Sequence, residues 1–253
     1  MAGHSKWANI KHKKARQDKK RGKIFSKLVK KITSAARRGG GDPEINPELR
    51  VYVDKAKDAN MPKENIERAI KKGTGDLEGV TYTDFRYEAY GPGGVAFLME
   101  GSTDNRNRTV AEIRHIFDKG GGNLGESGCV SWMFHSQGVI SLSSDDVDDA
   151  DEVLMVALEH GAEDIEQEDG VLTVTTTPET FADVRDALTE AGHDNFMSDE
   201  VTKLAENTLA PELSTVRKNM KLIETLEDHD DIEEFYHNLE LSDEVAEAID
   251  AEL

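Results

Sequence analysis

The first part of the chain changes abruptly from a segment with few apolar residues to one with helical periodicity. Residues 1–22 carry few apolar side chains beyond Trp7 and Ile10, too few to bury a core, so this arm is expected to be mobile when free. From Lys23, the stretch KIFSKLVKKITSAARRGGG spaces its apolar residues by three and four. It predicts a helix that ends at the glycines 39–41.

Two shorter helices are expected next. One follows Pro47 and places Leu49, Val53 and Ala56 inward; the other runs from Pro62 to Gly73, since proline suits the first turn of a helix. The three helices predict a small helical domain over residues 23–78, with GTGDLEG as its linker.

Beyond Val80 the apolar period becomes that of strands. TDFRYEAY alternates, VAFLME is a continuous apolar run, and GPGG between them predicts a turn. Thr109 and Glu112 have the spacing of a capping box, so a helix is expected to begin there and to end at Gly120. CVSWMF, residues 129–134, predicts a further strand.

Residues 136–204 read as a domain of the order βαββαβ. QGVISL predicts a strand, DDADEVLMVALEHG a helix, and AEDIEQEDGVLTVTT a hairpin turned at Asp169-Gly170. TPETFADVRDALTEAG predicts a helix capped by Thr177, and NFMSDEVTKLA a last strand. This order is that of the ferredoxin-like fold.

The fold class predicted is therefore α+β and multidomain. After Pro211 a helix and the strand IEEFYHNLEL are expected to complete the earlier α+β domain, which makes the ferredoxin-like domain an insertion. The predicted parts are a basic arm (1–22), a three-helix domain (23–78), an α+β domain (79–135 with 205–241), a ferredoxin-like domain (136–204) and an acidic tail (242–253).

Charge is strongly segregated along the 253 residues. The net charge of the chain is −20, yet residues 1–40 hold 14 Lys/Arg and one acid, whereas residues 76–253 hold 10 Lys/Arg and 43 acids. Such segregation indicates a basic end that meets a polyanion and an acidic body that avoids it. The alternative is an acidic surface of the halophilic kind with an incidental basic arm.

Composition favours the cytoplasm. No run approaches the roughly 18 apolar residues of a membrane span, and no apolar segment follows the basic N-terminus as it would in a secretory signal. A single cysteine, Cys129, permits no intramolecular disulfide and fits a reducing compartment.

The motifs of catalysis are missing from the sequence. There is no phosphate-binding P-loop, GESGC has Cys129 where a nucleophile elbow needs glycine, and the eight histidines show no metal-ligand spacing. We therefore expect no enzyme, no catalytic residue, no metal, no cofactor and no small-molecule substrate.

TDNRNRT lies between a predicted strand and a predicted helix and has two interpretations. It is either a polar turn with a helix cap, or a secondary site for a phosphate or a partner carboxylate. The residues of that site would be Asn105, Arg106, Asn107 and Arg108.

The basic arm and the first helix are the candidate nucleic-acid site. Lysine and arginine neutralise phosphates without sequence preference, and Trp7 and His12 can stack on unpaired bases, although Trp7 serves equally well as a packing anchor. An anionic membrane is the less favoured polyanion, because the arm has few apolar residues. The candidate contacts are Lys6, Trp7, Lys11, His12, Lys13, Lys14, Arg16, Lys19, Lys20, Arg21, Lys23, Lys27, Lys30, Lys31, Arg37 and Arg38.

Several motifs occur together and in order: AGHSKWANIKHKKARQDKKRGKIFSKL, NMPKENIERAIKKGTG, YEAYGPGGVAFLME, TDNRNRTVAEIRHIF and GGNLGESGCVSWMF. In these the chain resembles the YebC/PmpR family, which includes the mitochondrial translational activator of cytochrome c oxidase. The resemblance runs from residue 2 to about 240 and implies three domains, with an arm that is no removable presequence. It also implies that Lys6, Trp7, Lys11, His12, Lys13, Lys14 and Arg16 face RNA.

The resemblance leaves two functions to weigh. Family members are described as probable transcriptional regulators that bind DNA, and others as translation factors that act on the ribosome at proline-rich stretches. The first hypothesis is a ribosome-associated translation factor that contacts rRNA or tRNA; the second is a DNA-binding regulator, although no helix-turn-helix reading head is recognisable. A nuclease is disfavoured because the arm holds only Asp18 as an acid. The oligomeric state stays open.

Overall fold

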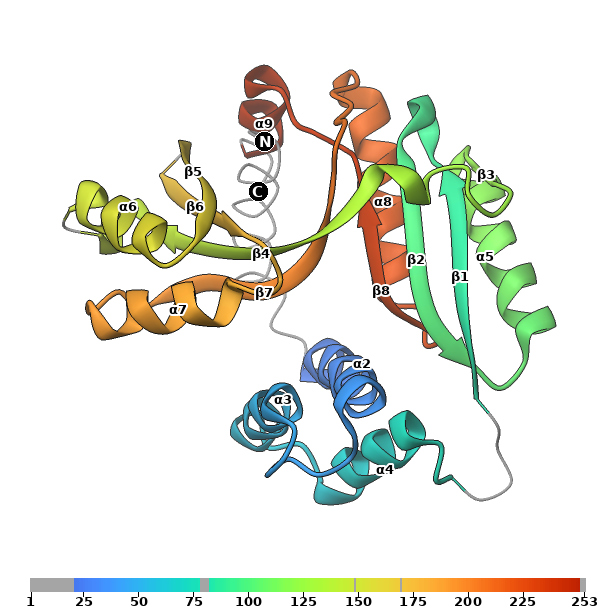
Figure 1. Cartoon of the computed structure of the whole chain (residues 1–253). Coiled ribbons are helices and arrows are strands. Elements are labelled where there is room, and N and C mark those ends of the chain that lie inside the picture. Colours follow the sequence, from blue (N-terminus) through green and yellow to red (C-terminus); the bar gives the residue numbers. More distant parts are fainter. Residues whose placement is uncertain (1–20, 78–81, 148, 169, 251–253) are drawn as a thin grey trace. The chain divides into compact units, whose positions relative to one another are not determined.

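The computed structural model describes residues 21–77, 82–147, 149–168 and 170–250, and of residues 21–24 and 250 it describes the backbone alone. Within these ranges the chain forms two compact units. One unit contains the described residues up to 131 together with 217–235, and the other contains 132–216 together with the described residues from 236. The predicted α+β, multidomain class is confirmed, with N-terminal helices followed by two antiparallel sheets (Figure 1).

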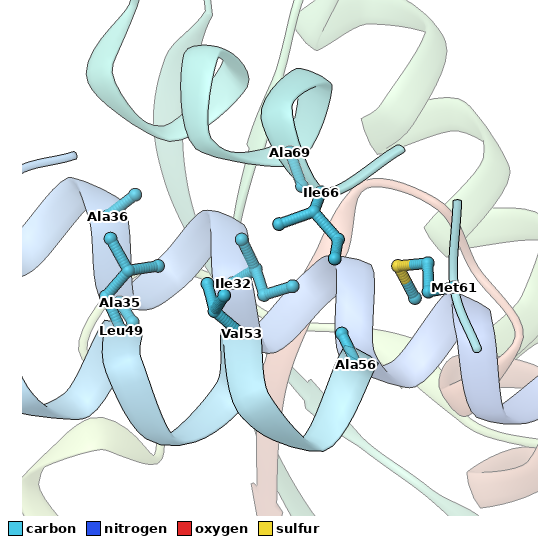
Figure 2. Close-up of a cluster of buried hydrophobic side chains, with 9 residues drawn as sticks. All are labelled: Ile32, Ala35, Ala36, Leu49, Val53, Ala56, Met61, Ile66 and Ala69. Atoms are coloured by element: carbon cyan, nitrogen blue, oxygen red, sulfur yellow. The ribbon is translucent and has the colours of Figure 1, made fainter. Parts of the chain in front are cut away.

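Three helices form the N-terminal domain: α2 (Arg21–Gly39), α3 (Pro47–Asp58) and α4 (Lys63–Thr74). Their apolar faces meet in one core, which Figure 2 shows: Ile32, Ala35, Ala36, Leu49, Val53, Ala56, Met61, Ile66 and Ala69. Asn46 caps α3 by accepting a hydrogen bond from the Leu49 amide, and its own side-chain amide donates to the carbonyl of Ala35 on α2. A capping residue thus also joins two helices.

The third helix does not end at Gly73, as the sequence had indicated. It continues to Thr74 and ends at Gly75, which adopts the left-handed conformation that glycine tolerates (φ 79°). Gly73 serves packing instead, because a Cβ atom there would lie 2.4 Å from the carbonyl oxygen of Thr33 and 2.8 Å from Cβ of Ala36 on α2. The missing side chain lets two helices approach closely.

The first sheet has the strand order β3-β1-β2-β8. Its strands are β1 (Thr83–Tyr90), β2 (Ala96–Thr103), β3 (Asn123–Leu124) and β8 (Ile232–His237). Strands β1 and β2 run antiparallel, with Phe85 opposite Gly101. Helices α5 (Arg106–Gly120) and α8 (Leu213–Glu227) belong to this domain, and the ring of Phe117 on α5 lies edge-on to Phe97 on β2, 5.4 Å away.

Two local predictions for this domain are wrong. Helix α5 begins at Arg106 with Asn105 as its N-cap, and Thr109 lies inside the first turn. No strand covers residues 129–133: Ser131–Met133 form a 3-10 turn, and strand β4 begins at Phe134. The physical reason in both cases is a buried carboxylate from elsewhere in the chain, described below.

The second sheet has the order β5-β6-β4-β7 and is antiparallel throughout. Its elements follow the predicted βαββαβ order: β4 (Phe134–Ser143), α6 (Ala150–Glu159), β5 (Ala162–Glu168), β6 (Val171–Thr176), α7 (Phe181–Glu190) and β7 (Phe196–Ala205). The core is formed by Ile140, Leu142, Val153, Ala157, Leu172, Val174, Val184 and Leu188. This is the ferredoxin-like arrangement. Because β8 follows it in sequence yet joins the first sheet, the domain is an insertion.

The ends of two elements differ from expectation. Helix α7 begins at Phe181, and Thr177 instead accepts a hydrogen bond from the Thr180 amide in the turn before it. At the C-terminus, the acidic segment expected to be a tail forms helix α9 (Asp243–Asp250) and buries Val245 and Ile249. An amphipathic pattern of two inward residues was too short to predict this helix.

Candidate nucleic-acid interface

Only part of the candidate interface lies within the described residues. Lys6, Trp7, Lys11, His12, Lys13, Lys14, Arg16, Lys19 and Lys20 lie outside them, and of Arg21 and Lys23 only the backbone is described, in the first turn of α2. The candidates whose side chains are described are Lys27, Lys30, Lys31, Arg37 and Arg38, all on α2.

The lysines near the middle of α2 meet the C-terminal end of α8. Lys27 Nζ lies 3.3 Å from Oε2 of Glu227, and Lys30 Nζ donates to the backbone carbonyl of Glu227 at 2.6 Å. Carbonyl groups at a helix C-terminus attract cations, so this contact gains from the helix dipole. Burial lowers the pKa of Lys30, while the nearby carboxylates of Asp230, Asp228 and Glu227 oppose that shift.

Arg37 forms the most complete of these contacts. Its two terminal nitrogens donate to the two oxygens of Glu233 on β8 at 2.7 and 2.9 Å, and its Nε lies 3.2 Å from Asp84. The Glu233 side chain is only 6% exposed and also accepts a hydrogen bond from the hydroxyl of Ser102 at 2.6 Å. A fork of this kind is a geometry in which arginine also binds phosphate.

The last cations of α2 share a second carboxylate of the same strand. Glu234 lies 3.4 Å from Arg38 Nη1 and 3.6 Å from Lys31 Nζ. Arg38 also pairs with Glu48 at the start of α3. Burial works against it, but the hydrogen bonds and charges of Glu48 and Glu234 raise the pKa of Arg38. Lys27, Lys31, Arg37 and Arg38 of α2 thus each lie beside a carboxylate, and Lys30 lies beside a backbone carbonyl.

The motif TDNRNRT runs from the last residue of β2 into the first turn of α5, and its two arginines differ. Arg108 lies 2.7 Å from Asp231 and 2.9 Å from Asp104, whereas Arg106 is exposed, and its side chain has no polar partner among the described residues. Asn105 accepts a hydrogen bond from the amide of Arg108, as a helix cap does. Asn107 is exposed like Arg106.

Asp231 explains why the predicted capping box did not form. It is 6% exposed and accepts hydrogen bonds from the hydroxyl of Thr109 at 2.6 Å and from Arg108. Burial alone would raise the pKa of Asp231, but these hydrogen bonds outweigh it and hold the pKa below its usual range. Thr109 is thus engaged by a residue 122 positions away, and Asn105 takes the cap.

A cleft of about 860 Å³ opens beside Arg108 within the same unit. Phe25, Lys30 and Lys72 line it from the helices, and Tyr82, Arg108 and Asp231 line it from the sheet domain. The ammonium group of Lys72 lies 4.9 Å from the centre of the Tyr82 ring. Because the lining mixes both signs of charge, the cleft is a poor match for a polyanion alone.

Glu88 accounts for the conformation of the GESGC segment. Its buried carboxylate accepts hydrogen bonds from the amides of Gly128, Val130 and Ser131, each at 2.7 or 2.8 Å. Those amides cannot also join a sheet, which is why the strand predicted at 129–134 is a turn. Burial would raise the pKa of Glu88, but the three amides outweigh it and lower the pKa.

Two further observations concern the described residues alone. They contain no group of three or more His, Cys, Asp or Glu side chains placed to hold a metal ion. None of their helices is both long and apolar enough to cross a bilayer.

The sequence matches two family models. One, described as the TACO1/YebC protein N-terminal domain, covers residues 5–76, and the other, described as the TACO1/YebC second and third domain, covers residues 82–239. The chain belongs to the TACO1/YebC family. The resemblance seen in the sequence is therefore confirmed.

Members of the TACO1/YebC family resemble this chain over nearly its whole length. A Halothermothrix orenii protein is 58% identical over 255 residues, with all of both chains covered, and a Geobacter sulfurreducens protein is 52% identical over 249 residues, covering 98% of this chain and 100% of the relative. Both are named probable transcriptional regulatory protein. A conserved hypothetical protein from Aquifex aeolicus, known from a crystal structure, is 44% identical in sequence. The two structures match with a TM-score of 0.74, and the match covers 90% of this chain and 93% of that one.

The residues that sequence reasoning missed are the carboxylates. Glu227, Glu233 and Glu234 engage the cations of α2, yet in the sequence they belong to an overwhelmingly acidic half. Nothing local distinguishes them from solvated acids. The alternation of IEEFYH as a strand was a signal, because it places the neighbouring acids Glu233 and Glu234 on opposite faces and so sets one of them inward.

The two arginines of TDNRNRT provide a matched test of that motif. Arg108→Ala is expected to lower the thermal midpoint, because it leaves the buried carboxylate of Asp231 without its cation. Arg106→Ala should leave the midpoint unchanged, since Arg106 is exposed and has no described partner. Thermal melts by circular dichroism measure both, and equal midpoints for the two variants would contradict the structural role of Arg108.

Glu88 predicts a specific dependence of stability on pH. Glu88→Gln should lower the free energy of unfolding by about 1–3 kcal/mol at pH 7, because an amide cannot accept all three hydrogen bonds. The folded-state pKa is lowered, so the carboxylate stabilises the fold above its ordinary pKa of 4.5, and this advantage is lost as the pH falls below that value.

Urea unfolding of wild type and Glu88→Gln at several pH values measures this difference. Glu126→Gln in the same loop is the control. It makes the same chemical change at a side chain that is exposed. A Glu88→Gln effect no larger than that of Glu126→Gln, or one that grows in acid, would refute the assignment.

Proposed function

We propose that this protein is a nucleic-acid-binding regulator of gene expression, and more specifically a ribosome-associated translation factor. It would contact rRNA or tRNA through its basic N-terminal arm and assist the synthesis of proline-rich stretches. The observation that carries the proposal is charge segregation: residues 1–22 hold eight Lys/Arg and one acid in a chain of net charge −20. The proline-rich substrate follows from the family resemblance alone.

The contacts along α2 support a division of labour within the candidate site. The arm residues would make the primary contacts with phosphate. The described cations of α2 would join them only by exchanging an existing partner for a phosphate. That partner is a backbone carbonyl for Lys30 and a carboxylate for Lys27, Lys31, Arg37 and Arg38. Such an exchange gives up an existing ion pair, so each of these cations adds less to the affinity than an arm lysine does.

The proposed role requires positioning and no bond-making step. A positively charged arm can track a nucleic-acid backbone, while Trp7 and His12 stack on unpaired bases. Arg106 and Asn107 remain candidates for a secondary phosphate contact, since both side chains are exposed. Asn105 and Arg108 would support them from within the cap of α5.

The alternative function is that of a DNA-binding transcriptional regulator. The name of the relatives, probable transcriptional regulatory protein, favours it. Backbone electrostatics serves RNA and DNA alike, so the distinction has to come from the stacking residues of the arm. Preference for single strands supports the translation factor, and preference for duplex DNA supports the regulator.

The salt dependence of binding tests the division of labour. Replacing Lys11, Lys13 and Lys14 with Gln should reduce the slope of log affinity against log salt by about 2 for single-stranded RNA, at roughly 0.7 per lost phosphate contact. The matched control replaces Lys27, Lys30 and Lys31 with Gln, and its slope should change less, because their charges are already engaged. Fluorescence anisotropy with a labelled single-stranded RNA measures both variants, and an unchanged slope for the arm variant would overturn the proposal.

A further inference from the structure

The outward face of helix α6 in the ferredoxin-like domain carries large apolar side chains. Val153 and Ala157 point into the core, whereas Leu154, Met155 and Leu158 are 38, 62 and 50% exposed. Positions separated by three and four residues are neighbours on a helix surface, so these three side chains adjoin one another. We call Leu154, Met155 and Leu158 the α6 apolar patch.

The fold itself gives no reason for this patch. The domain core is complete without it, since Val153 and Ala157 of α6 are fully buried against Val184 and Leu188. Helix α6 also has its own cap, because Asp149 accepts hydrogen bonds from the amides of Asp151 and Glu152. Contiguous exposed apolar residues on a soluble domain commonly mark an interaction surface.

The charge around the patch determines what can cover it. Residues 136–204 hold 19 acids and only two basic residues, Arg185 and Lys203. Exposed acids lie just before the patch at Asp151 and Glu152 and just after it at Glu159. A nucleic acid or an anionic membrane is repelled by this field, and so is the same face of a second copy. Only a partner that is both cationic and apolar satisfies the patch and its surroundings.

We propose that the α6 apolar patch docks a basic amphipathic segment of a partner protein. Apolar side chains of that segment would cover Leu154, Met155 and Leu158, and its Lys or Arg residues would pair with the acids on either side. Helical segments bind such surfaces through anchors spaced by three or four residues. Methionine at the centre suits this role, because its unbranched side chain adapts to different partners. The inference concerns a protein contact and does not depend on nucleic-acid binding.

Binding of a defined peptide to the full chain tests the proposal. The probe is a synthetic 18-residue peptide of Leu and Lys whose leucines form one helical face, and its control is the same composition shuffled so that this face is lost. We expect the replacement of Leu154, Met155 and Leu158 with Gln to weaken binding of the amphipathic peptide at least tenfold. The shuffled peptide should bind wild type at least tenfold more weakly than the amphipathic one.

The chain offers a matched control for exposed apolar residues in general. Ile45 and Val51 are 77 and 45% exposed in the helical domain, and Ile45→Gln with Val51→Gln should leave peptide affinity unchanged. All these positions are exposed, so circular dichroism should show intact folds. Equal binding by the α6 variant and wild type, or equal binding of the shuffled peptide, would overturn the proposal.

Crosslinking in cells identifies the natural occupant. A photo-reactive amino acid at position 155 of the full chain should crosslink to segments of another protein that are rich in Lys or Arg and carry apolar residues at helical spacing. The crosslinks should disappear when Leu154 and Leu158 are replaced with Gln. Crosslinks confined to residues 1–22 of this chain, to a second copy or to acidic segments would refute the assignment of a partner protein.

Discussion

The two-pronged contact between Arg37 on α2 and Glu233 on β8 is the one on which the unit of residues 21–131 and 217–235 depends. It joins the helical domain to the sheet through two hydrogen bonds of 2.7 and 2.9 Å to a side chain that is only 6% exposed. A buried carboxylate is tolerated because its charge is paired with Arg37 and because the hydroxyl of Ser102 donates a further hydrogen bond to it. Removal of Arg37 would leave the buried carboxylate of Glu233 without its cation.

The same contact constrains function. A cation that is already engaged by a carboxylate contributes to nucleic-acid affinity only the difference between two ion pairs. The basic face of α2 is therefore a poorer polyanion site than its composition indicates. The sequence begins with a basic segment, whereas the ferredoxin-like domain is acidic and carries an apolar patch on α6. We infer that they engage different kinds of partner.

Local periodicity predicted the elements and most of the core. Ile32, Leu49 and Val53 were expected inward and are buried, because helical spacing is a property of a few adjacent residues. The βαββαβ order followed in the same way. Two of the wrong predictions share a cause: Thr109 is engaged by Asp231, and the amides of Gly128, Val130 and Ser131 are engaged by Glu88. Neither partner is near in sequence, and each is a buried acid in a chain rich in exposed ones.

The sequence indicated which cations lie outside the apolar core of α2, but it did not indicate which residues they contact. The sequence correctly places Lys27, Lys30 and Arg37 away from the apolar core of α2, but it holds no signal that Glu227 and Glu233 would meet them. Such a pairing depends on how the chain returns after the inserted domain. The ion pair of Arg108 could not be predicted for the same reason, because its partner Asp231 lies beyond that insertion in the sequence.

The most direct test of the account is crosslinking in living cells, followed by sequencing of all the RNA and DNA that is recovered. The full chain is compared with a variant that lacks residues 2–22. The account predicts reads concentrated on ribosomal RNA and tRNA and lost in the deletion variant. Recovery of discrete promoter DNA, or of ribosomal RNA that the deletion does not diminish, would contradict it.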